Sequence, residues 1–320
     1  MGWWQLNTDT LAGSRFVVSP LAEATASLLT LAAGAAAHPA GKEWLAAHAP
    51  AYRERLDPIT ASLVRAALGQ EWLADFCTPP PTGDQRTFAE ELDQIRRTPP
   101  EVARADVAVS MRGSLPAELD RSDLPERIAD LLEWVWTRTV LPHWPRRRRI
   151  IEADVVSRTS QLGQGGWAAA LEDLRPGLRW LGEGRLQINA RNYPPREISG
   201  ARLLFVPVTP GHAWVAWDEP HTYAVIYPCS GVLAEPDRPP VPESLGRLLG
   251  AARAGVLVLL GTPKSTTQLV ALTGQGLGSV GRHLSVLLDA HLVRRRRAGR
   301  SVLYYRTEAG DVLVRAQGEG

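Results

Sequence analysis

The segment Glu235-Pro-Asp-Arg-Pro-Pro-Val-Pro242 most constrains the fold, because it divides the chain into two parts. Proline has a fixed φ and no backbone N–H, so this run cannot continue a helix or a central strand. We therefore predict a linker at 235–242 between an N-terminal domain, residues 1–234, and a C-terminal domain, residues 243–320. A chain of 320 residues is long enough for two domains that each bury a core.

The two parts carry opposite net charge. Residues 241–320 contain eleven basic and five acidic residues, a net charge of +6, whereas the whole chain has a net charge of only +2. Residues 1–240 are therefore acidic, with a net charge of −4. A small basic domain joined to a larger acidic one indicates a nucleic-acid or phosphate partner for the small domain.

The composition excludes several other classes of protein. The longest apolar stretch, residues 24–37, is shorter than the roughly 20 residues of a membrane-spanning helix. The first residues show no basic region followed by an apolar run, so we predict no secretory signal and a cytoplasmic location. The two cysteines, Cys77 and Cys229, lie far apart, which excludes a disulfide framework and a cysteine-based zinc cluster.

The C-terminal domain shows a sequence of elements typical of one DNA-binding fold. Apolar spacing predicts an amphipathic helix over 244–260, and Ser265 is placed to cap a second, short helix. A glycine-containing turn at 273–276 precedes a third helix, whose apolar side includes Val280 and Leu284. Two strand-like runs within 292–306 surround a turn at Ala298-Gly299, and Thr307 begins a last helix over 308–315. This order is that of a winged helix-turn-helix.

The third predicted helix presents small and polar residues on its outer face. Such a surface approaches base edges closely in the major groove, while the basic hairpin reaches phosphates or a minor groove. For His283, at the flank of that face, phosphate contact and packing against the domain are both open. The predicted DNA-binding residues are Thr266, Gly278, Ser279, Arg282, His283, Arg297 and Arg300.

Three segments of this domain resemble the ArsR/SmtB family of bacterial winged-helix transcription factors. They are Ser265-Thr-Thr-Gln-Leu-Val270, the run from Ser279 through Arg282-His-Leu to Val293, and Arg297-Ala-Gly-Arg-Ser-Val-Leu-Tyr-Tyr-Arg306. The resemblance covers roughly a quarter of the chain and implies a homodimeric, usually repressive DNA-binding protein. It places dimer contacts on the helix at 244–260 and the last helix, for which we predict Leu245, Leu248, Leu249, Val256 and Val312.

The chain also departs from the family pattern. Gly276 and Gly281 stand where family members usually carry serine, so the preferred DNA sequence is expected to differ or to depend more on DNA shape. Metal-sensing members carry a Cys-x-Cys pair near the start of the helix-turn-helix, or acidic and histidine ligands on the last helix. Residues 262–276 contain no cysteine and 307–320 no histidine, so we predict no metal site at those positions.

The N-terminal domain is predicted to be a helix-rich body closed by a small sheet, which makes the whole chain an α+β protein. Phe16-Val-Val-Ser-Pro-Leu-Ala-Glu23 and the region from Leu203 to Pro228 resemble larger ArsR-like regulators of high-GC bacteria, whose N-terminal domain has no established ligand. The predicted helices cover 20–36, 54–76, 86–97, 123–140, 146–160 and 166–181. The predicted strands cover 185–190, 201–208, 213–217 and 223–228, with another at Arg15–Pro20.

All eleven tryptophans precede the linker. They suit an aromatic pocket for a planar apolar ligand, but core packing explains them as well. Trp134, Trp136, Trp214 and Trp217 are the candidates for a pocket wall. A second group, His212, Asp218, Glu219, His221 and Cys229, has the chemistry of metal ligands, but its spacing fits no ligand template.

The sequence thus predicts a homodimeric transcriptional regulator, a repressor that binds double-stranded DNA at an inverted repeat. Its N-terminal domain would respond to a small-molecule effector, and no cofactor is predicted. The alternative is an enzyme or small-molecule-binding protein whose winged helix serves dimerisation or protein binding. No nucleophile, paired-carboxylate or cofactor signature supports an enzyme, and the basic hairpin disfavours a purely protein partner.

Overall fold

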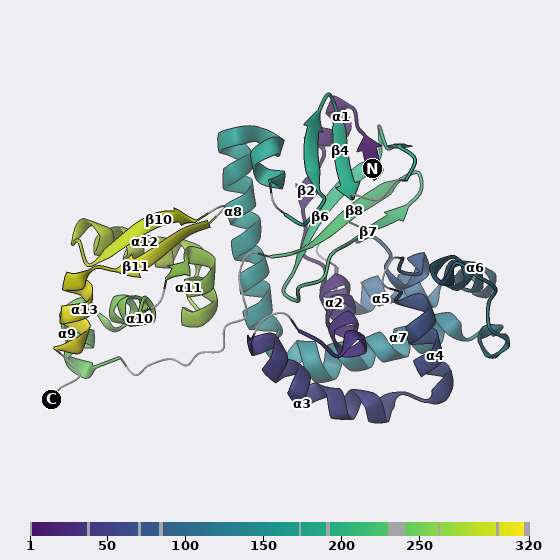
Figure 1. Cartoon of the computed structure of the whole chain (residues 1–320), viewed down its shortest axis with the longest axis horizontal. Helices are drawn as coiled ribbons and strands as arrows, with labels where there is room; N and C mark the ends of the chain where they lie inside the picture. Colours follow the sequence, from purple (N-terminus) through teal and green to yellow (C-terminus); the bar gives the residue numbers. More distant parts are fainter. Residues whose placement is uncertain are drawn as a thin grey trace. The chain divides into compact units, whose positions relative to one another are not determined.

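A computed structural model describes residues 2–36, 39–69, 72–82, 86–172, 174–189, 193–229, 241–261, 263–298 and 301–316 (Figure 1). The chain forms two compact units. Unit 1 comprises residues 1–145 and 158–229, and unit 2 comprises 146–157 and 230–320. The sequence predicts 146–157 in the N-terminal domain, but their contacts group them with unit 2. Most of the predicted linker, 235–240, lies outside the described residues.

Most of the helices belong to unit 1. The short helical segments are α1 (Thr8–Ala12), η1 (Asp75–Cys77), η2 (Ala117–Leu119), η3 (Trp136–Val140) and η4 (Leu141–His143). The longer helices are α2 (Pro20–Ala33), α3 (Pro39–Arg55), α4 (Pro58–Ala67), α5 (Phe88–Arg96), α6 (Pro100–Met111) and α7 (Leu124–Val135). Helix α8 (Trp144–Leu171) contributes residues to both units.

Helix α2 is buried along almost its entire length. The Ser19 side chain caps its start by accepting a hydrogen bond from the Ala22 backbone N–H, and Gly34 ends it in a left-handed conformation. One side of α2, including Leu21 and Leu28, packs into a helical core. The opposite side packs against a sheet, so the apolar stretch at 24–37 is largely a core helix covered on both sides. No helix among the described residues is both long and apolar enough to cross a membrane.

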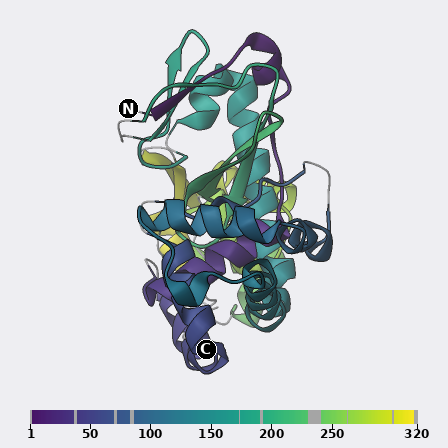
Figure 2. The ribbon, with the colours of Figure 1, turned by 90° about the vertical axis from the view of Figure 1, so that its right-hand side faces the viewer.

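Unit 1 also contains two four-stranded sheets, which lie above most of the helices of this unit in the views of Figures 1 and 2. The first sheet has the order β2-β6-β8-β7, with strands β2 (Arg15–Phe16), β6 (Arg202–Val208), β7 (Trp214–Asp218) and β8 (Thr222–Pro228). The second has the order β3-β4-β1-β5, with strands β1 (Gly2–Gln5), β3 (Arg179–Gly182), β4 (Arg185–Asn189) and β5 (Arg196–Glu197).

Both faces of the first sheet are covered, as its nearly continuous apolar strands require. Side chains alternate along a strand, so Leu204 and Val206 of β6 pack on the side of α2, while Leu203 and Phe205 point the other way. The second side is covered by residues of the other sheet, including Trp4. Phe205 contacts both Phe16 and Trp167, with ring centroids 5.4 and 5.3 Å away, and those two rings also stack on each other.

Unit 2 contains α9 (Glu243–Leu249), α10 (Ala251–Leu259), β9 (Lys264–Ser265), α11 (Thr266–Thr273), α12 (Leu277–Asp289), β10 (Val293–Ala298), β11 (Ser301–Arg306) and α13 (Glu308–Arg315). The strands form one sheet of order β10-β11-β9. The core gathers apolar residues from α10, α11, α12 and β10, together with Ala153 of α8. Thr307 caps the start of helix α13, because its side chain accepts a hydrogen bond from the Gly310 backbone N–H.

The structure confirms the predicted α+β fold class and most of the predicted elements. It corrects three of them. The helix predicted over 244–260 is two helices, because Gly250 adopts a φ of 82° between them. The helix predicted over 54–76 shortens to α4, and the one predicted over 166–181 ends at Leu171, before the turn at Gly177 and the strand β3. The prediction missed α3 and α6, whose apolar residues show weak helical spacing.

Candidate functional site

The N-terminal half of α12 exposes a small polar surface. Gly276 caps the helix without a side-chain hydrogen bond, so nothing bulky covers its first turn. Gly278 and Arg282 are exposed and Ser279 is half-buried, while Val280 on the opposite side is fully buried. The buried side fixes the helix on the core of unit 2, and the exposed side presents one guanidinium among small residues.

A short hydrogen-bonded chain of side chains runs along this surface. The Ser279 hydroxyl donates to Gln275 Oε1 at 3.0 Å and lies 3.4 Å from His283 Nε2. Partial burial lowers the pKa of His283, and the positive charges of Arg253 and Arg282 lower it further. His283 is therefore neutral at pH 7 and can accept or donate a hydrogen bond without adding charge.

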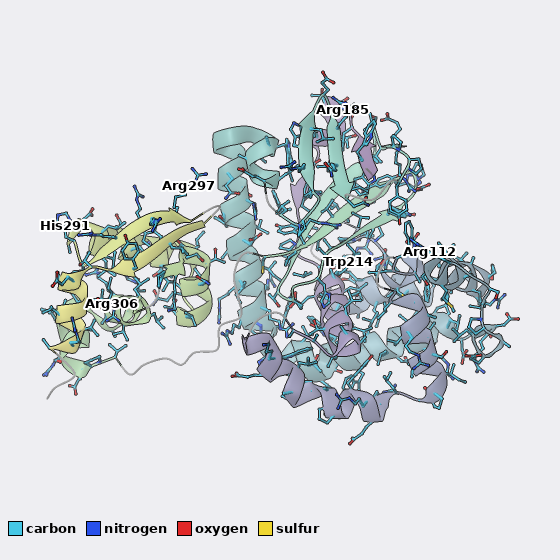
Figure 3. All side chains as sticks on the ribbon, viewed as in Figure 1. Arg112, Arg185, Trp214, His291, Arg297 and Arg306 are labelled. Carbon is cyan, nitrogen blue, oxygen red and sulfur yellow. The ribbon has the colours of Figure 1, made fainter. Side chains whose placement is uncertain are left out.

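The helix before α12 and the hairpin after it complete the surface. A capping box fixes the start of α11: Ser265 Oγ accepts from the Gln268 backbone N–H, and Gln268 Oε1 accepts from the Ser265 N–H. Thr266, the first residue of α11, is half-exposed. In the hairpin, residues 294–297 are four consecutive exposed arginines, of which Arg297 is labelled in Figure 3. Arg297 of β10 is opposite Val302 of β11. The predicted contact Arg300 lies outside the described residues.

The residues predicted at the dimer interface separate into two sets. Leu248 of α9 and Val312 of α13 are 62% and 54% exposed, and Leu249 is half-buried. Leu245 and Val256 are fully buried within unit 2, where they pack in its own core. The structure places these two residues in the core of unit 2 instead of on a surface that a second copy could cover, which corrects their prediction as dimer contacts.

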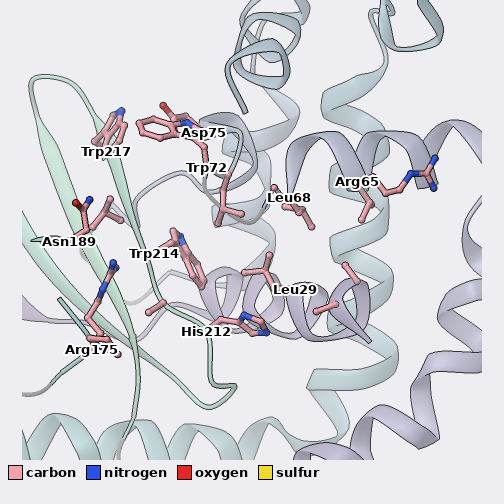
Figure 4. Close-up of a pocket in the computed structure, with 18 of the residues that line it drawn as sticks. Leu29, Arg65, Leu68, Trp72, Asp75, Arg175, Asn189, His212, Trp214 and Trp217 are labelled. Carbon is pink, nitrogen blue, oxygen red and sulfur yellow. The ribbon is translucent and has the colours of Figure 1, made fainter. Parts of the chain in front are cut away.

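A cavity of about 1000 Å³ lies within unit 1. Its wall includes Leu29 of α2, Val64 of α4, Leu68 just after α4, and Trp214 on the edge strand β7. In the view of Figure 4, Trp214 extends toward the middle of the cavity between Leu29 and Arg175. The volume is sufficient for a drug-sized ligand, and the wall is mostly apolar.

Only half of the predicted pocket wall belongs to this cavity. Trp214 and Trp217 line it, whereas Trp134 and Trp136 do not. Trp136 stacks on Phe88 at a centroid distance of 4.7 Å, inside the helical core. Trp136 lies in η3, directly after the amphipathic helix α7. The sequence does not reveal that the apolar side of α7 and η3 packs against α2 and α5 instead of β7.

The structure adds polar groups to the cavity that the sequence analysis missed. Asp75, at the start of η1, lines the wall, and burial and the neighbouring Asp106 raise its pKa to about 6. The charge of Arg196 and hydrogen bonds from Trp217 and Trp72 limit this rise. None of these residues belongs to a recognisable motif, because they converge from distant parts of the chain.

Arg175 is the second charged group that the sequence analysis missed. It lies in the turn between α8 and β3, held on both sides by the buried residues Leu174 and Leu178. Its Nη1 atom is buried and has no hydrogen-bond partner among the residues that the structure describes. Burial lowers the pKa of Arg175 to about 10, so the side chain stays charged at pH 7.

The second predicted group of polar residues does not form a metal site. His212 Nε2 lies 3.1 Å from Thr30 Oγ1, and burial lowers the pKa of His212. Glu219 forms an ion pair with Arg196. Nowhere in the described part of the chain do three or more His, Cys, Asp or Glu side chains come together to hold a metal ion.

Comparison of the chain with protein-family models, curated proteins and solved structures finds no match. Two features of the structure bear on function: the exposed surface of α12 with the hairpin in unit 2, and the cavity in unit 1.

Proposed function

We propose that the protein is a sequence-specific DNA-binding transcriptional repressor that acts as a homodimer through a winged helix-turn-helix in unit 2. Helix α12 is the recognition helix and the hairpin β10–β11 is the wing. The observation that carries this proposal is the exposed start of α12, with Gly278, Ser279 and Arg282, on the same small unit as four consecutive exposed arginines. We propose no enzymatic activity, and such a regulator would act in the cytoplasm.

The chemistry of the surface supports two separate roles. Arg282 can donate two hydrogen bonds to a guanine edge, and the small residues beside it allow the helix to approach the bases. The hairpin arginines neutralise phosphates, which contributes affinity but no direct sequence information. The resemblance to ArsR/SmtB proteins is consistent with this division, and the absence of Cys in 262–276 and of His in 307–320 favours a regulator without metal at those positions.

Binding to the DNA upstream of the protein's own gene, measured by fluorescence anisotropy over a salt series, tests the proposal. The wild type should bind this DNA about a thousandfold more tightly than random DNA. Arg282→Ala should lose most of that preference, whereas Arg297→Ala should weaken all DNA equally and lower the salt slope by about 1. Arg247→Ala, on α9, removes the same charge and should change neither.

The dimer has its own test. Leu248 and Val312 are the exposed apolar residues of α9 and α13, so they are the residues that a second copy can cover. Leu248→Glu with Val312→Glu should convert the dimer to a folded monomer in sedimentation experiments and weaken operator binding. Random and upstream DNA bound equally weakly by a wild-type dimer would contradict the repressor.

The cavity in unit 1 favours a second candidate function, small-molecule binding, in which the winged helix serves dimerisation or protein contacts. Under the main proposal the same cavity holds an effector that favours one state of the dimer. The two functions differ in one measurement, because only the repressor binds specific DNA.

A further inference from the structure

The cavity of unit 1 contains one charged group whose environment is incomplete. Arg175 Nη1 is buried and unpaired among the described residues, although buried guanidinium groups are normally matched by a carboxylate or by carbonyl oxygens. The residues on either side, Leu174 and Leu178, are buried in the core that covers the first sheet, so Arg175 is held in place. An anion entering the cavity would supply the missing partner.

The acidic residue of the cavity is already engaged elsewhere. Asp75 receives hydrogen bonds from Trp72 and Trp217, and the charge of Arg196 acts on it. Arg196 itself lies 4.4 Å from the centroid of the Trp217 ring. In Figure 4, Asp75 lies with Trp72 and Trp217, while Arg175 lies nearer Asn189 and Trp214. The two charged groups therefore mark different parts of the wall.

The rest of the wall suits an aromatic body. Trp72 contacts both Tyr193 and Trp217 edge to face, with ring centroids 5.9 and 5.4 Å apart. Trp214 adds a third indole on β7. Indole and phenol rings favour flat apolar ligands, because they bury a large area in stacked or edge-to-face contacts.

We propose that the cavity of unit 1 binds an aromatic small molecule with a single anionic group, which pairs with Arg175 while its rings lie against Trp214. This names the ligand class of the effector in the proposed function and rests on that function only for its regulatory meaning. Ligand binding itself is a property of unit 1 and is measured without DNA. A failure of DNA binding would leave it intact, and the reverse also holds.

The test uses two fluorescent dyes of similar shape on the full chain: anilinonaphthalene sulfonate, which is anionic, and N-phenylnaphthylamine, which is neutral. Both should bind saturably, with energy transfer from tryptophan. Arg175→Gln should weaken the anionic dye at least about tenfold, the effect of losing one charge-assisted hydrogen bond. The neutral dye should change by less than about twofold. Arg175→Lys should retain part of the preference for the anion.

Two further variants place the dyes in the cavity. Arg53→Gln removes an exposed arginine of α3 that does not line the cavity, so it should change neither affinity. Ala61→Trp fills space on α4, where Ala61 lines the cavity, and should weaken both dyes. Thermal unfolding checks each variant, and Arg175→Gln should be at least as stable as the wild type, because it removes a charged group whose buried Nη1 has no partner among the described residues.

The outcomes separate cleanly. Selective loss of the anionic dye in Arg175→Gln, with both dyes lost in Ala61→Trp, supports the proposal. Failure of the wild type to bind the anionic dye would overturn it, and so would equal weakening of both dyes in Arg175→Gln. The proposal is equally overturned if both dyes still bind Ala61→Trp unchanged, because they would then occupy another surface.

Discussion

The surface of α12 in unit 2 and the cavity in unit 1 both depend on an arginine, but the two sites are built in different ways. Arg282 lies on a regular helix, exposed, with its neighbours drawn from one short stretch of chain. Arg175 lies in a turn, and the residues around its cavity come from positions as distant as Leu29 and Trp217. A site built from consecutive residues can be predicted from the sequence of those residues. The composition of a site built from distant residues depends on how the whole unit folds.

The largest effect that tests this difference is expected from Phe205→Ala. Phe205 is fully buried in contact with Phe16 and Trp167, so its loss should lower the free energy of unfolding of unit 1 by about 3–5 kcal/mol. All eleven tryptophans belong to unit 1, so tryptophan fluorescence in urea reports this unit alone.

Val102→Ala is the matched control, because Val102 is 44% exposed on α6 and should cost under about 0.5 kcal/mol. Far-UV circular dichroism should retain a transition from unit 2 that Phe205→Ala does not shift. A common shift of both transitions would contradict the treatment of the units as separate folding bodies.

A pH-dependent effect, also in unit 1, comes next in size. Glu91 is buried on α5 and accepts hydrogen bonds from the Leu21 backbone N–H at 2.8 Å and the Ser19 hydroxyl at 3.0 Å. Burial nevertheless raises the pKa of Glu91 to about 7. The pKa of Glu91 is higher in the folded than in the unfolded state, so the folded protein favours the protonated carboxyl. The contribution of Glu91 to the free energy of unfolding is therefore fully present below about pH 4.5 and is lost as the pH rises through 7.

The wild-type free energy of unfolding should therefore fall by up to roughly 3 kcal/mol between pH 4.5 and pH 8 from this group. Urea titrations at both pH values, followed by tryptophan fluorescence, measure the fall. Glu91→Gln should remove most of it, whereas Glu54→Gln, which replaces an exposed carboxyl of α3, should not. An identical fall in Glu91→Gln would assign the pH dependence to other groups.

The fold could be predicted well where local signals agree. Ser265, the turn at 273–276 and Thr307 lie at helix boundaries that the structure confirms, because capping and turn chemistry act over a few residues. Gly250 shows where such reading fails. The apolar residues before and after Gly250 keep helical spacing, but the positive φ of Gly250, 82°, breaks the helix.

The cavity could be predicted only in part, for a physical reason. Trp214 and Trp217 both line the cavity from the edge strand β7, although their spacing of three residues places them on opposite faces of the sheet, Trp214 with the α2 side and Trp217 with the other. Trp136 is predicted on the pocket wall from its residue type alone, but it packs on Phe88. The element against which an amphipathic helix packs is set by long-range contacts, which residue type does not reveal. Arg175 and Asp75 gain their properties from burial, which a single residue in a turn does not reveal.

A smaller effect is expected at the capping box of α11 in unit 2. Ser265→Ala removes the acceptor of the Gln268 N–H, which lies 3.2 Å from Ser265 Oγ, and should cost about 1 kcal/mol. The loss should appear in the circular dichroism of the unit 2 transition, while the tryptophan signal stays unchanged. Ser285→Ala, an exposed position of α12, should cost less than half as much. A shift of the tryptophan transition in Ser265→Ala would show that the two units share stability.

The smallest effect concerns the charge that opposes an anion in the cavity. Asp75, with a pKa of about 6, is mostly ionised at pH 7 and protonated at pH 5. Besides Arg196, Trp72 and Trp217, it faces Asp106, whose pKa burial also raises, and Arg196 is paired with Glu219. Protonating Asp75 removes a repulsion of less than about 1 kcal/mol, so affinity for anilinonaphthalene sulfonate should rise by less than about fivefold between pH 7 and pH 5.

Asp75→Asn separates this effect from the other groups that titrate. His212 also borders the cavity and gains charge as the pH falls, which would attract the same dye. In Asp75→Asn, affinity for the anionic dye should rise less between pH 7 and pH 5 than in the wild type, and the remaining rise belongs to His212 or Asp106. The neutral dye should bind equally at both pH values in every variant. A wild-type slope that Asp75→Asn leaves intact would remove Asp75 from the electrostatics of the cavity, while Arg175→Gln would still decide whether the anion is held by its guanidinium.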